Sequence, residues 1–234
     1  MALHLAGLTW PEVPADSLLV VPVGSCEQHG PHLPMDTDLR IAVALCDALG
    51  DARTDVGVAP VLAVTASGEH QSFPGTLSIG TEATTQVVIE LVRSALPPAG
   101  TARPSPFRAV VLVNGHGGNV EALAAAQRLL GSEGRHVTVW HPRIADGDSH
   151  AGATETSIML HLHPDAVRVD RIEPGATARW RHMGPTVMEH GLAAVTANGI
   201  LGDPTAATAE HGAELVGQLV DDLRRCVERE HGSR

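Results

Sequence analysis

Short apolar runs alternate with helical patterns along the first two thirds of the chain. The apolar runs lie at 17–23, 57–64, 107–113 and 136–141. They are rich in Val and show no polar alternation, which is typical of strands in a sheet that is covered on both faces. Hydrophobic residues recur at helical spacing over 38–49, 81–96, 119–130 and 205–231. This alternation predicts a layered α/β fold with a mostly parallel sheet.

Two stretches interrupt this pattern. Residues 97–106 are rich in Pro and small residues, and we expect a surface connection there. Residues 170–204 contain many Gly, Pro and turn-forming residues, so the sequence assigns them no element. Asn119 stands where it could cap the third helix. The length of 234 residues fits a single domain over 1–234.

Composition and net charge limit the kinds of core, partner and cellular location that we expect for this chain. The chain is 43% hydrophobic but only 2% aromatic, with no Tyr, so we expect a core of Val, Leu, Ile and Ala. A formal net charge of −11 argues against binding nucleic acid or an anionic membrane. No signal peptide or membrane-length apolar stretch is visible. The three cysteines lack metal-ligand spacing, and we expect reduced, mostly buried thiols in a cytoplasmic protein.

The loop after the first apolar run concentrates carboxylates and imidazoles. Within residues 24–38 it contains Glu27, His29, His32, Asp36 and Asp38. Glycines and prolines in the same loop can bend the backbone so that these side chains converge. Carboxylate and imidazole groups at the end of a strand are what a divalent metal site requires. A solvated polar loop is the alternative for any one of these residues.

Two later loops repeat this arrangement. His116 lies in the glycine-rich segment 114–119, directly after the third apolar run, and the glycines leave room for a ligand. His150 and Glu155 lie in 146–157, ahead of another helical segment. Ligands of open α/β sheets bind beyond the carboxyl ends of the strands, so these loops should meet there. Glu155 could alternatively be a carboxylate that caps its helix.

Together the loops offer three carboxylates and two imidazoles to a pair of divalent ions. Such a pair can be Zn, Fe(II) or Mn, because carboxylate and His ligation allows all three. A paired site bridged by a carboxylate and a water acidifies that water and polarises a carbonyl oxygen, which is the chemistry of amide hydrolysis. His70 could line the same pocket. The remaining histidines are more simply surface or core residues; they include His161, His163, His182, His190 and His211.

The three loops together resemble the creatininase family of metal-dependent amidohydrolases. The motifs that carry the resemblance are 22–30 with 36–38, then 73–76, 114–119 and 150–157. The resemblance implies an α/β/α sandwich, a dinuclear metal site and a ring-like homo-oligomer, often a hexamer. It also implies metal ligands at four positions, which are Glu27, His29, Asp38 and His116. Asp38 would be the bridging carboxylate and His150 the catalytic histidine, beside a metal-bridging hydroxide that attacks the scissile carbonyl.

One departure from the family pattern bears on the substrate. Creatininase itself has an aromatic residue and then a metal-binding Glu after the His of this motif, where this chain has Gly117 and Gly118. The tryptophans that pack on creatinine are also missing ahead of His150. Creatinine is therefore a poor candidate substrate. Glu155 is the most plausible replacement for the missing carboxylate, either as a ligand or as the catalytic base.

Within the family, the Gly-Gly form with a compact C-terminal half looks most like members that remove a modified C-terminal Val-Tyr unit from a small ribosomal precursor peptide. A second subgroup deformylates a pyrimidine intermediate of flavin-type cofactor synthesis. A protein that binds metal without catalysis is the alternative outside enzymes. The clustering of ligands beside a spare His argues against it, since purely structural sites leave no open position.

Overall fold

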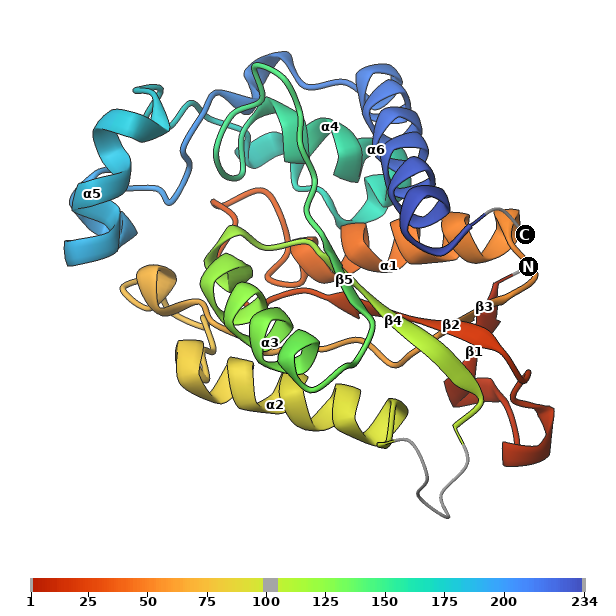
Figure 1. Ribbon diagram of the computed structural model, residues 1–234. Helices are drawn as coiled ribbons and strands as arrows, with labels where there is room; N and C mark the ends of the chain where they lie inside the picture. Colours follow the sequence, from red (N-terminus) through yellow and green to blue (C-terminus); the bar gives the residue numbers. More distant parts are fainter. Residues whose placement is uncertain (1, 99–104, 233–234) are drawn as a thin grey trace.

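The computed structural model describes residues 2–98 and 105–232, which form a five-stranded sheet with helices on both sides (Figure 1). The strands are β1 (Leu3–His4), β2 (Ser17–Val23), β3 (Val56–Val58), β4 (Phe107–Asn114) and β5 (Val137–Trp140). The helices are α1 (Thr37–Ala52), α2 (Gly80–Ala95), α3 (Val120–Ser132), α4 (Ala153–Leu162), α5 (Trp180–His190) and α6 (Ala209–His231). The strand order is β1-β3-β2-β4-β5 and every pair is parallel, which confirms the predicted α/β class.

Both faces of the sheet are buried, and β2 shows how. Leu18 and Val20 pack into one core with α1, α4 and α6, whereas Leu19 and Val21 pack into a second core with α2 and α3. Figure 1 shows these two groups of helices on opposite sides of the sheet. Successive strand residues point to opposite faces, so a strand covered on both sides needs apolar residues at every position. This explains why the apolar runs do not alternate.

The second apolar run is the largest error in the predicted elements. Of residues 57–64 only the first two belong to a strand, β3, which ends at Val58. Beyond it Ala59 N still donates to Val20 O (2.8 Å) and Leu62 N to Pro22 O (3.0 Å), so the chain continues along β2. Pro60 interrupts the ladder because it has no amide hydrogen.

The helical predictions differ from the structure mainly at their ends. The C-terminal helix begins at Ala209, not at 205, because Thr208 is its cap and accepts a hydrogen bond from His211 N (3.1 Å). The unassigned stretch 170–204 contains α5 and short 3-10 helices. In Figure 1, α5 stands at the edge of the molecule, away from the sheet.

Three further predictions concern the connection 97–106, the cysteines and membrane-spanning segments. Of the predicted connection 97–106, residues 99–104 lie outside the described residues. All three cysteines are free, but Cys46 alone is buried, so the expectation of mostly buried thiols was wrong. Among the described helices, none has the length and apolar character needed to cross a membrane.

A buried ion cluster at the amino ends of the strands yields a test of pH dependence. The two Asp55 carboxylate oxygens accept hydrogen bonds from Arg53 Nε (3.0 Å) and Nη2 (2.9 Å), and Arg108 also pairs with this carboxylate. Burial alone would raise the pKa of Asp55, but the two guanidiniums outweigh it and lower the pKa. A carboxylate with a lowered pKa stabilises the fold above its unfolded pKa and loses this contribution as the pH falls.

We therefore expect Asp55→Asn to lower the free energy of unfolding at pH 7. The difference from the parent should shrink as the pH drops below the ordinary Asp pKa of about 3.9. Urea unfolding of both proteins between pH 3 and pH 7 measures this. Asp221→Asn, at an exposed position of α6, is the control. A difference that stays constant over this range would contradict the assignment.

Candidate metal centre

The predicted site residues meet where the connections between strands leave the middle of the sheet in opposite directions. From β2 the chain passes to β3 on one side, while β4 and β5 lie on the other side of β2. The crevice beyond the carboxyl ends of β2 and β4 is therefore the topological switch point, where α/β sheets bind ligands. Glu27 follows β2 and His116 follows β4, so the two loops meet across this crevice.

Glu27, Asp38 and His116 form one compact group. His116 Nδ1 lies 3.1 Å from Glu27 Oε1 and 3.2 Å from Asp38 Oδ2, and all three residues are buried. Ser25 Oγ donates to the same Asp38 oxygen at 2.7 Å. Asp38 lies in the first turn of α1, a rigid position that directs its carboxylate towards both loops.

The other oxygen of Asp38 faces a second group. His29 Nε2 lies 3.0 Å from Asp38 Oδ1 and 3.9 Å from Glu155 Oε2. The opposite nitrogen, His29 Nδ1, lies 3.1 Å from Glu27 O, which fixes the ring. Each carboxylate oxygen of Asp38 thus faces a different imidazole.

A third group contains a residue that sequence reasoning placed only at the margin of the pocket. His70 Nε2 lies 3.3 Å from Glu27 Oε1, and the rings of His70 and His150 are 4.5 Å apart. Glu27, His70 and His150 offer ligand atoms close enough to share one ion. The signal that could have found His70 is the loop position of Gly68–His70, which reaches the same sheet edge from β3.

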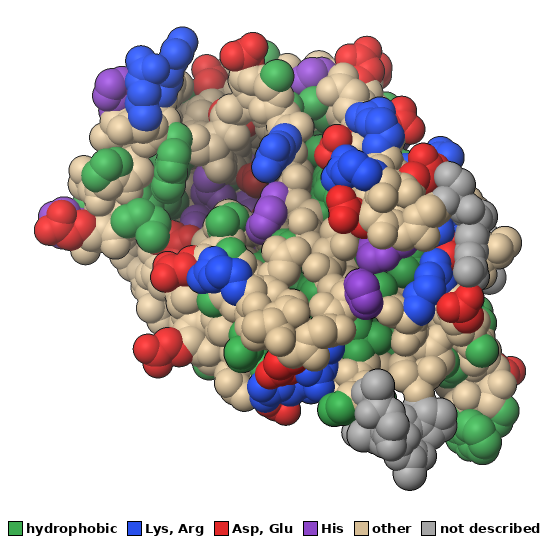
Figure 2. Space-filling model, viewed as in Figure 1, with side chains coloured by type: hydrophobic (Ala, Val, Ile, Leu, Met, Phe, Trp, Pro, Cys, Tyr) green, Lys and Arg blue, Asp and Glu red, His purple; other side chains and the backbone are tan. Residues whose placement is uncertain are grey.

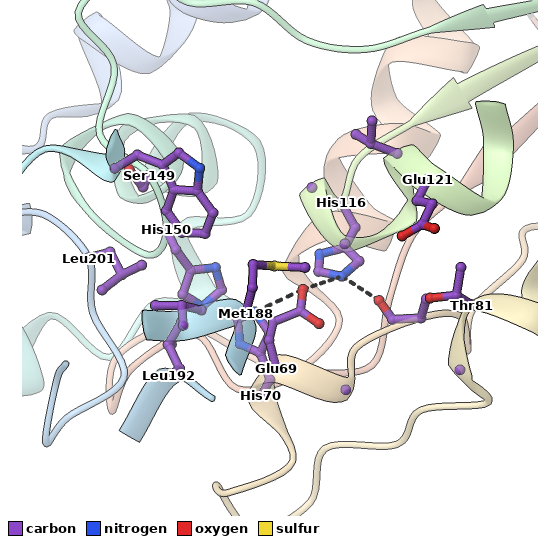
Figure 3. Close-up of a pocket in the computed structure, with 18 of the residues that line it drawn as sticks. Glu69, His70, Thr81, His116, Glu121, Ser149, His150, Met188, Leu192 and Leu201 are labelled. Carbon is purple, nitrogen blue, oxygen red and sulfur yellow. Dashed lines mark hydrogen bonds and ion pairs between the residues drawn. The ribbon is translucent and has the colours of Figure 1, made fainter. Parts of the chain in front are cut away.

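Sequence reasoning also missed two supporting residues. Gln28 Nε2 lies 3.1 Å from His70 Nδ1 and donates to Gly199 O at 3.0 Å, so it fixes His70 against the loop before α6. Glu69 is largely buried and reaches within 3.6 Å of His116 Nε2, as drawn in Figure 3. Burial raises the pKa of Glu69.

The chemistry of these side chains fits a divalent cation. Both carboxylate oxygens of Glu27 are buried and make no hydrogen bond within the described chain, although His116 and His70 lie within ion-pair distance of Oε1. A carboxylate buried in this way is costly unless positive charge neutralises it. Burial alone would lower the pKa of His29, yet the adjoining Asp38 raises it to about 10. The carboxylates therefore attract positive charge strongly, and a metal ion could displace these protons.

His150 and Glu155 have opposite electrostatic surroundings. Burial and the neighbouring His29 and His70 hold the pKa of His150 well below its usual value. Burial raises the pKa of Glu155 to about 7, with Asp38 adding to the effect and His29 opposing it. A neutral imidazole beside a carboxyl group that titrates near neutrality is an arrangement suited to proton transfer.

The first amides of α4 bond to Asp148 and not to Glu155. Asp148 accepts hydrogen bonds from the amides of Ala153 and Thr154, the first residues of this helix. Glu155 Oε2 instead accepts from Ala151 N (2.6 Å), and Ala151 has a left-handed backbone with φ of 52°. Glu155 thus lies in the first turn of α4, as the capping alternative has it, but the amides of the helix itself bond to Asp148, and the same Glu155 oxygen lies 3.9 Å from His29 Nε2.

Two other predicted details need correction. Asn119 stands at the N-cap position of α3, but its side chain makes no capping bond. Its amide bonds to Ala66 N (3.2 Å) and Gly24 O (3.1 Å), which ties the three loops together. Asp36, part of the first loop's acidic cluster, points away from the site and pairs with Arg40 at 2.7 Å.

His32 is buried, but it lies outside the three ligand groups. Its Nε2 bonds to Thr156 Oγ1 at 2.8 Å, at the start of α4. Gly115 shows why glycine is needed in the second loop, since a Cβ there would lie 2.5 Å from Asp38 O. Gly117, by contrast, faces open space, as expected for a residue beside a substrate site.

Two cavities of about 680 Å³ each flank the cluster. The α5 cavity exposes Glu69, His70, His116 and His150 to an apolar wall that includes residues of α5 (Figure 3). The α4 cavity is lined by Glu155 and Arg143, among others. Gly117 and Ser149 line both. Figure 2 shows histidine and acidic side chains at the bottom of a hollow on this face.

Comparison with known proteins agrees with this geometry. The family model described as creatinine amidohydrolase matches residues 6–227. The mycofactocin precursor peptide peptidase of Mycolicibacterium smegmatis is 48% identical over 218 residues, which cover 91% of this chain and 85% of the relative.

Solved creatininases share the fold over the whole chain. A mutant creatininase described as the Zn-Zn type and a creatininase described with Mn each superpose with a TM-score of 0.80 at 28% identity, and each comparison covers 100% of both chains. The sheet order, the loops at its switch point and these matches lead to one conclusion. This chain belongs to the creatininase family and is a hydrolase of amide carbon–nitrogen bonds.

Proposed function

We propose that this protein is a metal-dependent peptidase that releases the modified C-terminal Val-Tyr unit from the mycofactocin precursor peptide. The observation that carries the proposal is the buried group of carboxylates and imidazoles between two cavities. The peptidase named for this substrate is 48% identical. Cavities on both sides of the cluster would accommodate a peptide substrate that extends beyond the scissile bond in both directions.

We assign two divalent cations to the site. Glu27, Asp38 and His116 would hold one, and His29, Asp38 and Glu155 the other, with Asp38 between them. The arrangement of Asp38 supports this, because its two oxygens face His116 and His29 separately. Bound cations there would polarise the scissile carbonyl and activate a water. Zn, Fe(II) and Mn all suit this ligand set.

We assign proton delivery to His150. Its Nε2 donates to Gln28 O at 2.8 Å, which orients the ring, and the residue lines the α5 cavity. A ring fixed in this way can pass a proton to the amine that leaves when the amide breaks. Glu155, with its pKa near 7, is the alternative proton carrier.

Two further assignments concern the assembly and its location. We propose that residues 1–234 act as one domain and that copies assemble into a ring, as a hexamer. We also propose a cytoplasmic location, which the three free cysteines support. Light scattering of the purified protein tests the assembly.

The function is tested by mass spectrometry of the protein reconstituted with Fe(II) or Zn. The substrates are a decarboxylated peptide ending in the Val-Tyr-derived unit and, in parallel, a pyrimidine formamide. We expect release of a two-residue C-terminal product from the peptide. Loss of formate from the pyrimidine alone would instead assign the chain to the deformylase subgroup. Bound metal without turnover of either substrate would favour a binding protein.

A further inference from the structure

One wall of the α5 cavity is apolar and partly exposed. It is formed by Trp180, Val187 and Met188 of α5, with Leu192 and Leu201 beside them. Trp180 is 46% exposed and Met188 is 70% exposed, whereas most large apolar residues of the chain are buried. Exposed apolar side chains that line a cavity usually contact a ligand or a partner.

Trp180 is held in a defined orientation. A Cβ at Gly184, one turn later in α5, would lie 2.9 Å from the Trp180 ring, so the indole rests directly on the helix backbone. An aromatic ring whose position is preset can stack on a ligand with little further loss of rotamer freedom. The α4 cavity has a smaller apolar lining, and no Trp or Met is among the described residues that line it.

The two cavities also give the substrate a direction. His150 lines the α5 cavity, and Glu155 lines the α4 cavity. A proton donor must lie beside the amine that leaves, so the leaving unit occupies the cavity of His150. The acyl portion, which is the body of the peptide, then extends past Gly117 into the α4 cavity.

We propose that Trp180 and Met188 bind an apolar, aromatic-containing group on the amine side of the scissile amide and so determine which leaving units are accepted. The proposal rests on the proposed function, because the direction depends on proton delivery by His150. Trp180 and Met188 would act only by contact with the substrate and would take no part in the covalent chemistry.

The test compares two peptides that differ only in the leaving unit, one ending in valyl-tyramine and the other in valyl-diaminopentane. Trp180→Ala should raise KM for the tyramine peptide about 10-fold and leave kcat nearly unchanged, which is the size of effect that one aromatic contact supplies. KM for the diaminopentane peptide should stay the same, and Trp180→Phe should restore most of the loss. Trp10→Ala is the matched control, since Trp10 is 87% exposed and lies outside the cavity.

A binding measurement separates this proposal from the proposed function. Calorimetric titration with valyl-tyramine should show binding to the parent protein and about 10-fold weaker binding to Trp180→Ala, whether or not either peptide is cleaved. Absence of turnover in the parent protein would contradict the peptidase assignment alone. Equal binding by both proteins would overturn the role of Trp180. A change in the light-scattering mass of Trp180→Ala would also overturn it, by assigning this wall to contact between copies.

Discussion

Replacing Asp38 with Ala is expected to remove bound metal and turnover together. The two oxygens of Asp38 face His29 and His116, so one substitution affects both groups of ligands. Loss of a residue that only supports a ligand costs about 10- to 100-fold in affinity or activity. Loss of a shared ligand should therefore exceed this, on the order of 10³-fold in kcat/KM. Metal content by mass spectrometry and turnover of the peptide measure both effects.

The matched control for Asp38→Ala is Asp36→Ala. Asp36 precedes Asp38 by two residues, but its side chain is 40% exposed and pairs with Arg40. The control should keep its metal and its activity. If Asp38→Ala retained two metals per chain, the bridging assignment would be wrong. Circular dichroism of each variant should show the fold intact.

Replacing His150 with Ala is expected to preserve both metals and to lower kcat. Proton transfer by a positioned side chain contributes typically 10²- to 10⁴-fold, so a loss on the order of 10³-fold in kcat is expected. His150 Nε2 is already engaged with Gln28 O, and we assign the residue to proton transfer and not to metal binding. Metal analysis and single-turnover kinetics test the two halves of this prediction separately.

The competing assignment for His150 is that of a metal ligand. His150 could share one ion with Glu27 and His70, or one with His29 and Glu155, so loss of one metal in His150→Ala would support this assignment. An unchanged kcat would remove His150 from the mechanism altogether. His161→Ala is the control, because His161 is exposed near the end of α4, six residues after Glu155. Glu155→Gln, analysed in the same way, tests Glu155 as the alternative proton carrier.

The main fold could be predicted from the chain because its local patterns agree with its tertiary arrangement. The uninterrupted apolar runs at β2 and β4 indicated strands buried on both faces, and the structure shows two separate cores against them. The strand predicted over 57–64 is too long because Pro60, which has no amide hydrogen, interrupts the hydrogen-bond ladder. The element α5 was missed because its helix contains Pro185 and lies among Gly and Pro residues that indicate turns.

By itself, the sequence determined the class of fold, the family and the loops that supply the chemistry, because these depend on residue type and spacing. It could not show which oxygen of Asp38 faces which histidine, that His70 joins the cluster, or that the first amides of α4 bond to Asp148 and not to Glu155. Those relations join residues from different loops, and only the parallel order of the strands brings the loops together. The apolar wall of α5 beside His150 is likewise a product of tertiary packing, since about thirty residues separate them in the chain.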